Sequence, residues 1–226
     1  MLSKNIIKAS DKDRVKKIIN FLNLGFKDYL ASRVLLNSKL NLQGAIFAST
    51  AIEKYFKALL AFYWDKSEGH LKTSILNAVK NMDRKLYSSF NESFLKLLIK
   101  VYKLRYLDNH FDDSFNIQIC NKQFLSELDY TVAQIQDRIV IAQGTQILKT
   151  AYNFYEDKKD PQLYENNHIL TGIEKVEIIK QPNFVYAIAF TDNYNFLEIT
   201  YETLDSIVEN DFMKPGMIVN KQQGTA

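Results

Sequence analysis

The chain has 226 residues, 46% hydrophobic and 24% charged, so it can bury a sizeable core as one large domain or as a medium domain with an appendage. It contains no run of about 18 apolar residues and no apolar segment near its N-terminus, so neither a membrane span nor a secretion signal is expected, and a cytoplasmic protein is predicted. The single cysteine, Cys120, excludes an intrachain disulfide.

The net charge of +3 is unevenly distributed along the chain. Residues 1–150 carry a net charge of +9, whereas residues 151–226 carry −6. This asymmetry is compatible with a first part that meets a polyanion such as RNA and a second part that shields it or contacts another protein. Two independently soluble units of different composition would give the same asymmetry.

Three amphipathic helices are predicted in the first part of the chain. Ser10 and Asp13 have the spacing of a capping box, which predicts a helix from residue 10 to about residue 38. The second helix, residues 41–63, is apolar on two sides, as expected of a central helix. A short third helix is predicted over residues 70–81. Its first residue, a histidine, is expected at the helix start or as a hydrogen-bonding group of the core.

The next predicted helix, residues 92–107, places Arg105 on its packing face. At about 100° per residue, Arg105 shares that face with Phe94, Leu98 and Val101. A guanidinium is rarely buried without an anionic partner, so Arg105 is expected to contact a carboxylate, a phosphate or a neighbouring subunit. Glu53 on the central helix is the candidate carboxylate. A structural Glu53–Arg105 pair and a catalytic Arg105 are therefore alternatives.

The second half of the chain begins with a predicted loop over residues 112–121. A long helix from about residue 122 follows, which either ends at Gly144 or continues to about residue 155. Residues 156–161 hold five charged side chains followed by a proline, which predicts a domain boundary.

Beyond this boundary the hydrophobic period changes from about 3.6 residues to 2. Residues 175–178 and 197–202 alternate between apolar and polar positions, and residues 184–190 alternate between larger and smaller apolar side chains, which predicts a three-stranded antiparallel meander. The predicted fold is therefore mainly α. An antiparallel bundle of helices alone occupies residues 1–156, and a small α+β unit with the meander occupies residues 157–226.

The sequence contains few of the motifs that mark common enzyme classes. It has no glycine-rich phosphate loop, no zinc-protease motif and no hydrolase nucleophile motif. Arg105 and His110 remain, five residues apart. An imidazole can take the proton from an RNA 2′-hydroxyl while a guanidinium holds the phosphate as negative charge builds on it. This chemistry requires no metal, and no metal or cofactor is predicted.

Three motifs in this order resemble the HEPN family (higher eukaryotes and prokaryotes nucleotide-binding). They are AIEKYFKALL at residues 51–60, GHLKTSIL at residues 69–76, and the Arg-x4-His spacing of Arg105 and His110. The resemblance implies a helical bundle and a metal-independent endoribonuclease, in which Arg105 stabilises the phosphate and His110 is the general base or acid. The implied role is that of a toxin-like or stress and defence ribonuclease.

The resemblance also implies partners. RNA or a nucleotide is the expected ligand, with Asn109 in the substrate-binding part of the site. On a straight helix Arg105 and His110 would lie about 140° apart, so either the helix ends near residue 107 or a homodimer shares the site. A separate antitoxin or nucleotidyltransferase chain is a further expected partner. Tyr106 departs from the Asn, Asp or His of active members, which favours the alternative of a non-catalytic nucleotide- or protein-binding module.

Overall fold

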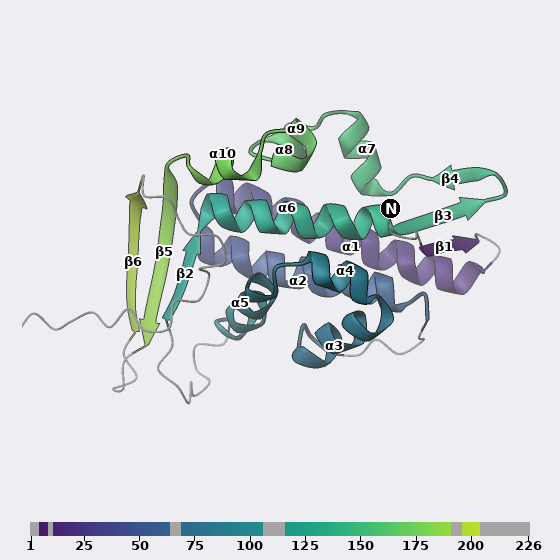
Figure 1. Ribbon diagram of the computed structural model, residues 1–226, viewed down its shortest axis with the longest axis horizontal. Coiled ribbons are helices and arrows are strands. Elements are labelled where there is room, and N and C mark those ends of the chain that lie inside the picture. The colour runs from purple at the N-terminus through teal and green to yellow at the C-terminus, as the bar shows by residue number, and fades with distance from the viewer. Residues whose placement is uncertain (1–4, 9–10, 64–68, 106–115, 191–195, 204–226) are drawn as a thin grey trace, which may run out of the picture.

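The computed structural model describes residues 5–8, 11–63, 69–105, 116–190 and 196–203. The molecule is mainly helical, and two small three-stranded sheets stand at opposite ends of the helical body (Figure 1). Within the described ranges, no helix is both long enough and apolar enough to cross a membrane.

The helices differ widely in length. The longer ones are α1 (Lys12–Asn37), α2 (Asn41–Leu60), α5 (Glu92–Lys103) and α6 (Asn121–Arg138). The shorter ones are α3 (Thr73–Met82), α4 (Arg84–Ser89), α7 (Ala151–Asp157), α8 (Pro161–Tyr164), α9 (His168–Thr171) and α10 (Lys175–Ile179). The strands are β1 (Asn5–Lys8), β2 (Asn116–Cys120), β3 (Ile139–Gln143), β4 (Gln146–Leu148), β5 (Asn183–Phe190) and β6 (Phe196–Thr203).

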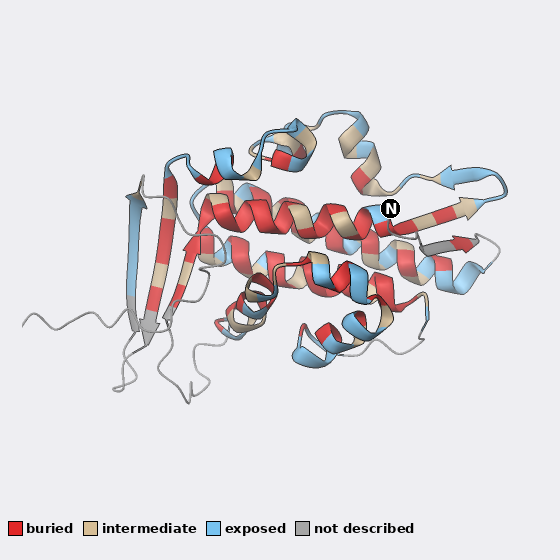
Figure 2. Cartoon of the chain, in the orientation of Figure 1, coloured by how far each residue is buried: buried red, intermediate tan, exposed pale blue. Residues whose placement is uncertain are grey.

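The prediction that the second helix is central is confirmed, because α2 contacts α1, α3, α5 and α6. Small side chains let α1 approach α2 closely. A Cβ atom at Gly44 would lie 2.6 Å from the Leu36 side chain, and the Ser32 hydroxyl donates a 2.7 Å hydrogen bond to the Gly44 carbonyl. The first predicted helix is confirmed as α1, whereas Ser10 lies outside the described residues. Figure 2 shows that α6 is also buried along most of its length.

A buried ion pair joins α1 to α6. The side chains of Arg33 and Asp129 are both fully buried, and the Arg33 guanidinium donates to the Asp129 carboxylate. Tyr29 also donates to this carboxylate, at 2.6 Å, and burial together with the carboxylate charge raises the pKa of Tyr29. Arg33 further donates to the backbone carbonyls of Gln162, at 3.0 Å, and Glu165. One guanidinium therefore fixes α1, α6, and α8 with the residue that follows it to one another.

The second and third predicted strands are confirmed as β5 and β6, but the first predicted strand, residues 175–178, was wrong. The strand order is β2-β5-β6 and all pairs are antiparallel, with Ile117 opposite Ile188. Residues 175–178 instead lie in α10, which buries Ile178 and Ile179 and leaves Val176 exposed. Adjacent buried residues suit one helical turn, whereas a strand would turn them to opposite faces. β2 occupies part of the predicted loop over residues 112–121.

The prediction of helices alone before residue 156 was also wrong. β1 pairs in parallel with β3, and β3 forms an antiparallel hairpin with β4. Gly144, with φ of +60°, lies in the hairpin turn, a backbone conformation that side chains rarely adopt. The long helix therefore ends at Arg138, and α7 is a separate helix. Apolar residues at 139 and 141 fit either a helix face or alternate positions of a strand, so the pattern did not decide between them.

The segments on the two sides of residue 156 share both a sheet and a core. β2 lies before this point and β5 after it, and they pair along five residues. One hydrophobic cluster runs from Ile7 through the helical body to Ile188. The predicted units, residues 1–156 and 157–226, are thus packed together in the structure.

The buried ion pair gives a first prediction about stability. Arg33→Met would leave the buried Asp129 carboxylate without its cation, so the free energy of unfolding should fall by about 3–5 kcal/mol in urea denaturation. Arg14→Met, at an exposed arginine near the start of the same helix, should change it by about 1 kcal/mol or less. The double variant Arg33→Met/Asp129→Leu should recover part of the loss. An Arg33→Met protein as stable as the Arg14→Met protein would contradict this reading.

Candidate functional site

Arg105 is exposed, so the prediction that it lies on the packing face was wrong. The helix α5 stops at Lys103 and the chain turns at Leu104 and Arg105, so Leu104 is buried in the core and Arg105 is not. The Arg105 guanidinium carbon lies 5.1 Å from the centroid of the Tyr102 ring, within the range of a cation–π contact. The argument for a buried Glu53–Arg105 pair therefore no longer applies.

His110 and Asn109 lie outside the described residues, as does Tyr106. Their predicted roles in proton transfer and substrate binding stay predictions. Arg105 is the last described residue before this gap.

Glu53 is a buried carboxylate on α2. Its Oε1 atom lies 2.8 Å from the Lys57 ammonium, one helical turn further on. Its Oε2 atom accepts a 3.0 Å hydrogen bond from the backbone N–H of Leu71, just before α3. These two contacts hold the carboxylate in one orientation and bind the start of the α3 region to α2.

His70 lies between these groups and Tyr102. Its side chain is 61% exposed, so the prediction of a core hydrogen-bonding histidine was wrong, and α3 begins only at Thr73. Its Nδ1 atom lies 3.6 Å from Glu53 Oε2, beyond a hydrogen bond but within ion-pair distance. Its ring centroid lies 4.8 Å from that of Tyr102, with the two planes 31° apart. Sequence analysis missed His70 as a site residue.

We call His70, Tyr102 and Arg105, with Glu53 and Lys57 at their base, the His70–Arg105 face. An exposed imidazole and a guanidinium each lie near the same aromatic ring there. An imidazole moves protons, a guanidinium binds phosphate oxygens, and aromatic rings are the usual partners of unstacked bases. The combination is suited to the chemistry of a phosphodiester with a neighbouring base.

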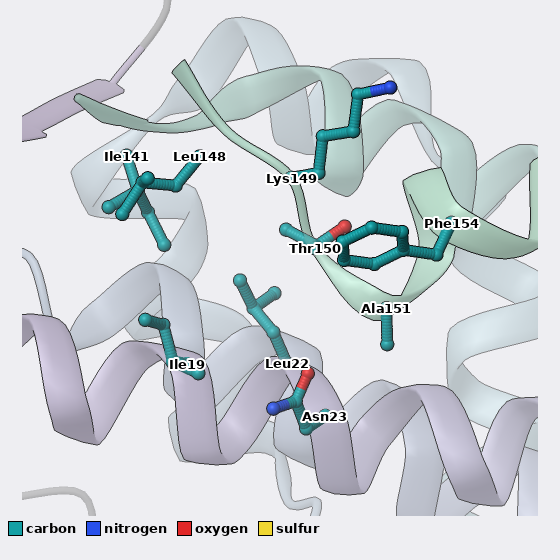
Figure 3. A pocket seen from close by; sticks show the side chains of 9 residues that line it. All are labelled: Ile19, Leu22, Asn23, Ile141, Leu148, Lys149, Thr150, Ala151 and Phe154. Carbon is teal, nitrogen blue, oxygen red and sulfur yellow. The ribbon is translucent and has the colours of Figure 1, made fainter. Parts of the chain in front are cut away.

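A cavity of about 230 Å³ lies between α1, the β3–β4 hairpin and the start of α7 (Figure 3). It is lined by Ile19, Leu22, Asn23, Ile141, Leu148, Lys149, Thr150, Ala151 and Phe154. Its lining is mainly apolar, and its polar side chains are largely used elsewhere. Thr150 caps α7, and the Lys149 ammonium pairs with Asp157 at 2.5 Å. The cavity therefore offers little chemistry of its own, and the His70–Arg105 face is the better candidate.

No protein-family model, curated protein or solved structure matches this chain. The resemblance to HEPN domains rests on its three motifs. Of these, the structure places the first on α2, brings His70 of the second against Tyr102 of α5, and puts the Arg105 guanidinium of the third within cation–π range of the same ring.

The contacts of this face predict that changes at Glu53 and at Arg105 affect stability to different extents. Glu53→Ala would leave the Leu71 N–H and Lys57 without their acceptor, so the free energy of unfolding should fall by about 1–3 kcal/mol. Arg105→Ala removes an exposed side chain and should change it by no more than about 0.5 kcal/mol. Urea denaturation of both variants, with Glu53→Gln as a matched control of similar shape, measures the difference. A large loss for Arg105→Ala would show that this side chain is structural.

Proposed function

We propose that this chain is a metal-independent endoribonuclease of the HEPN type, with the role of a toxin-like or stress and defence ribonuclease in the cytoplasm. The observation that carries the proposal is the His70–Arg105 face. Arg105 is exposed and therefore accessible to a phosphate, and it lies against Tyr102, whose ring also contacts His70. A fixed guanidinium beside an aromatic ring suits a single-stranded nucleic acid.

The proposed reaction uses the substrate's own 2′-hydroxyl as nucleophile. Arg105 binds the scissile phosphate and stabilises the charge that builds on its oxygens in the transition state. His110, five residues along the chain, takes the proton of the 2′-hydroxyl, and Asn109 contributes to substrate binding. The products are a 2′,3′-cyclic phosphate and a free 5′-hydroxyl. DNA lacks the nucleophile and is not a substrate.

The charge distribution supports RNA as the substrate. Residues 1–150, which contain the whole face, carry a net charge of +9, and a basic surface attracts the phosphate backbone. The acidic residues 151–226 suit a protein partner better. A separate antitoxin or nucleotidyltransferase chain is the partner that this family assignment proposes.

A second candidate function is a non-catalytic module that binds nucleotide or protein. The cation–π pair of Tyr102 and Arg105 favours it, because stacking and a phosphate contact suffice for binding without any proton transfer. Tyr106, which departs from the residues of active family members, favours it also. In its nucleotide-binding form, this module would share the RNA ligand with the ribonuclease and would differ from it in leaving the RNA uncut.

The ribonuclease proposal predicts cleavage of single-stranded RNA in excess EDTA, with 2′,3′-cyclic phosphate ends and no cleavage of DNA. His110→Ala should slow cleavage by about a hundredfold or more, the usual size of a general acid–base contribution. Arg105→Ala should slow it by a similar factor, because the phosphate loses its cation. Arg84→Ala, which removes an exposed arginine at the start of α4, is the matched control and should cleave normally.

Two outcomes would contradict the ribonuclease proposal and favour the binding module. The first is that the wild-type protein cuts no RNA, although it binds RNA in a manner that depends on Arg105. The second is that cleavage continues unchanged in a well-folded His110→Ala protein. A thermal melt of every variant separates loss of chemistry from loss of fold.

We further propose a two-fold homodimer with the Arg105 end of α5 at or near its interface. Two copies of Arg105 and His110 would then line one basic groove and grip a phosphate backbone from both sides. Light scattering at micromolar protein should give about twice the chain mass of 26.3 kDa. A strictly monomeric protein that still cleaves RNA would refute the shared site.

A further inference from the structure

The α8–α10 segment, residues 161–179, consists of short helices packed against the longer ones (Figure 1). The helices α9 and α10 contact α6, and α8 contacts α1. Figure 2 shows that much of the segment is exposed, and the side chains that it buries are Leu163, Asn167, His168, Ile178 and Ile179. Since a segment with few buried contacts opens more easily than the core, its attachment depends on these side chains.

His168, the first residue of α9, is a buried histidine at this contact. Only 7% of it is exposed, and its Nδ1 atom is buried without a hydrogen-bond partner among the residues that the structure describes. The residue before it is fixed, because the Asn167 side chain donates to the Leu163 carbonyl at 3.0 Å and to the hydroxyl of the neutral Tyr29 at 3.4 Å. A protonated imidazole carries a proton on both nitrogens, so it would bring a buried N–H without an acceptor.

Four charged side chains act on this imidazole, and they already balance one another. Asp129 and Glu127 come from α6. Arg33 comes from α1 and Lys175 from α10. Arg33 pairs with Asp129, and Lys175 pairs with Glu127. The two ion pairs carry no net charge, so a proton on His168 would place in the interior a positive charge that neither pair compensates.

We propose that protonation of His168 releases the α8–α10 segment from α6, so that the attachment of this segment depends on pH. Burial has the largest effect on the pKa of His168, and it lowers that pKa from the usual value of 6.5. The carboxylates of Asp129 and Glu127 raise the pKa, and the cations of Lys175 and Arg33 lower it. The effect of burial exceeds that of the two carboxylates.

The direction of the pH dependence follows from this lowered pKa. In the released segment the imidazole regains its usual pKa, so it binds a proton as the pH falls through about 6.5. The packed imidazole of His168 is still neutral at that pH. The attachment is therefore complete above about pH 6.5 and weakens as the pH falls below this value.

Release would break contacts that join the segment to the longer helices. Lys175 would leave Glu127, and the carbonyls of Gln162 and Glu165 would leave the Arg33 guanidinium. The helices α1 and α2 also pack directly on each other. Acidification should therefore open the α8–α10 segment before it opens the core around α2.

Hydrogen exchange of the full chain at pH 7.5 and pH 5.5 tests the proposal. In wild type, the protection factors of the amides in residues 161–179 should fall by up to about tenfold between these values, because one proton is taken up on opening. His168→Gln has no titrating group at this position and should show little change. His70→Gln, which removes an exposed histidine elsewhere, is the matched control and should behave as wild type.

Two results would overturn the proposal. One is unchanged protection of the segment in wild type, and the other is an equal loss in wild type and His168→Gln. Should His168→Gln fold poorly in a melt, proton NMR of the three histidines of the wild-type chain gives a second measurement. One imidazole should titrate below pH 6.5, in step with the loss of protection. Three imidazoles that all titrate at or above pH 6.5 would also overturn the proposal.

Discussion

The ion pair between Arg33 and Asp129 is the contact on which the arrangement of the chain depends. Both side chains are fully buried, so each must be paired to be tolerated, and the Nε and Nη2 atoms of Arg33 donate to carbonyls of Gln162 and Glu165. The helix α8 and the residue after it are thereby held against α1 and α6. From there the chain reaches β5, which pairs with β2 at the end of the bundle. Residues far apart in sequence therefore form one core.

A second buried carboxylate, that of Glu53, positions the chain in the candidate site. Glu53 is held by Lys57 and by the backbone of Leu71, and it sets the position of the chain before α3. That position places His70 against Tyr102 of α5, where Arg105 also lies. The site is thus assembled by three elements around one fixed charge. The exposed side chains of the site, such as Arg105, contribute little to stability, whereas the buried Arg33 contributes much.

The helices and strands that depend on local periodicity were predicted correctly from the sequence. It located α1, α2, α5, β5 and β6, because each of them repeats apolar residues over several turns or pleats. It failed where the decision depends on distant partners. The partner of β5 is β2, 60 or more residues earlier in the chain. Arg105 is exposed because α5 ends at Lys103, before the predicted packing face reaches it. The motif containing Glu53 and the one containing His70 were both recognised, but only their contact in the fold identifies His70 as a site residue.

The central claim is that the His70–Arg105 face binds single-stranded RNA. Irradiation of the protein with an RNA oligonucleotide, followed by mass spectrometry of the cross-linked peptides, tests it most directly. The account predicts adducts on the peptide that contains Tyr102, and their loss in the Arg105→Ala protein. Adducts confined to other surfaces, such as the β1-β3-β4 end of the molecule, with none at Tyr102, would contradict it.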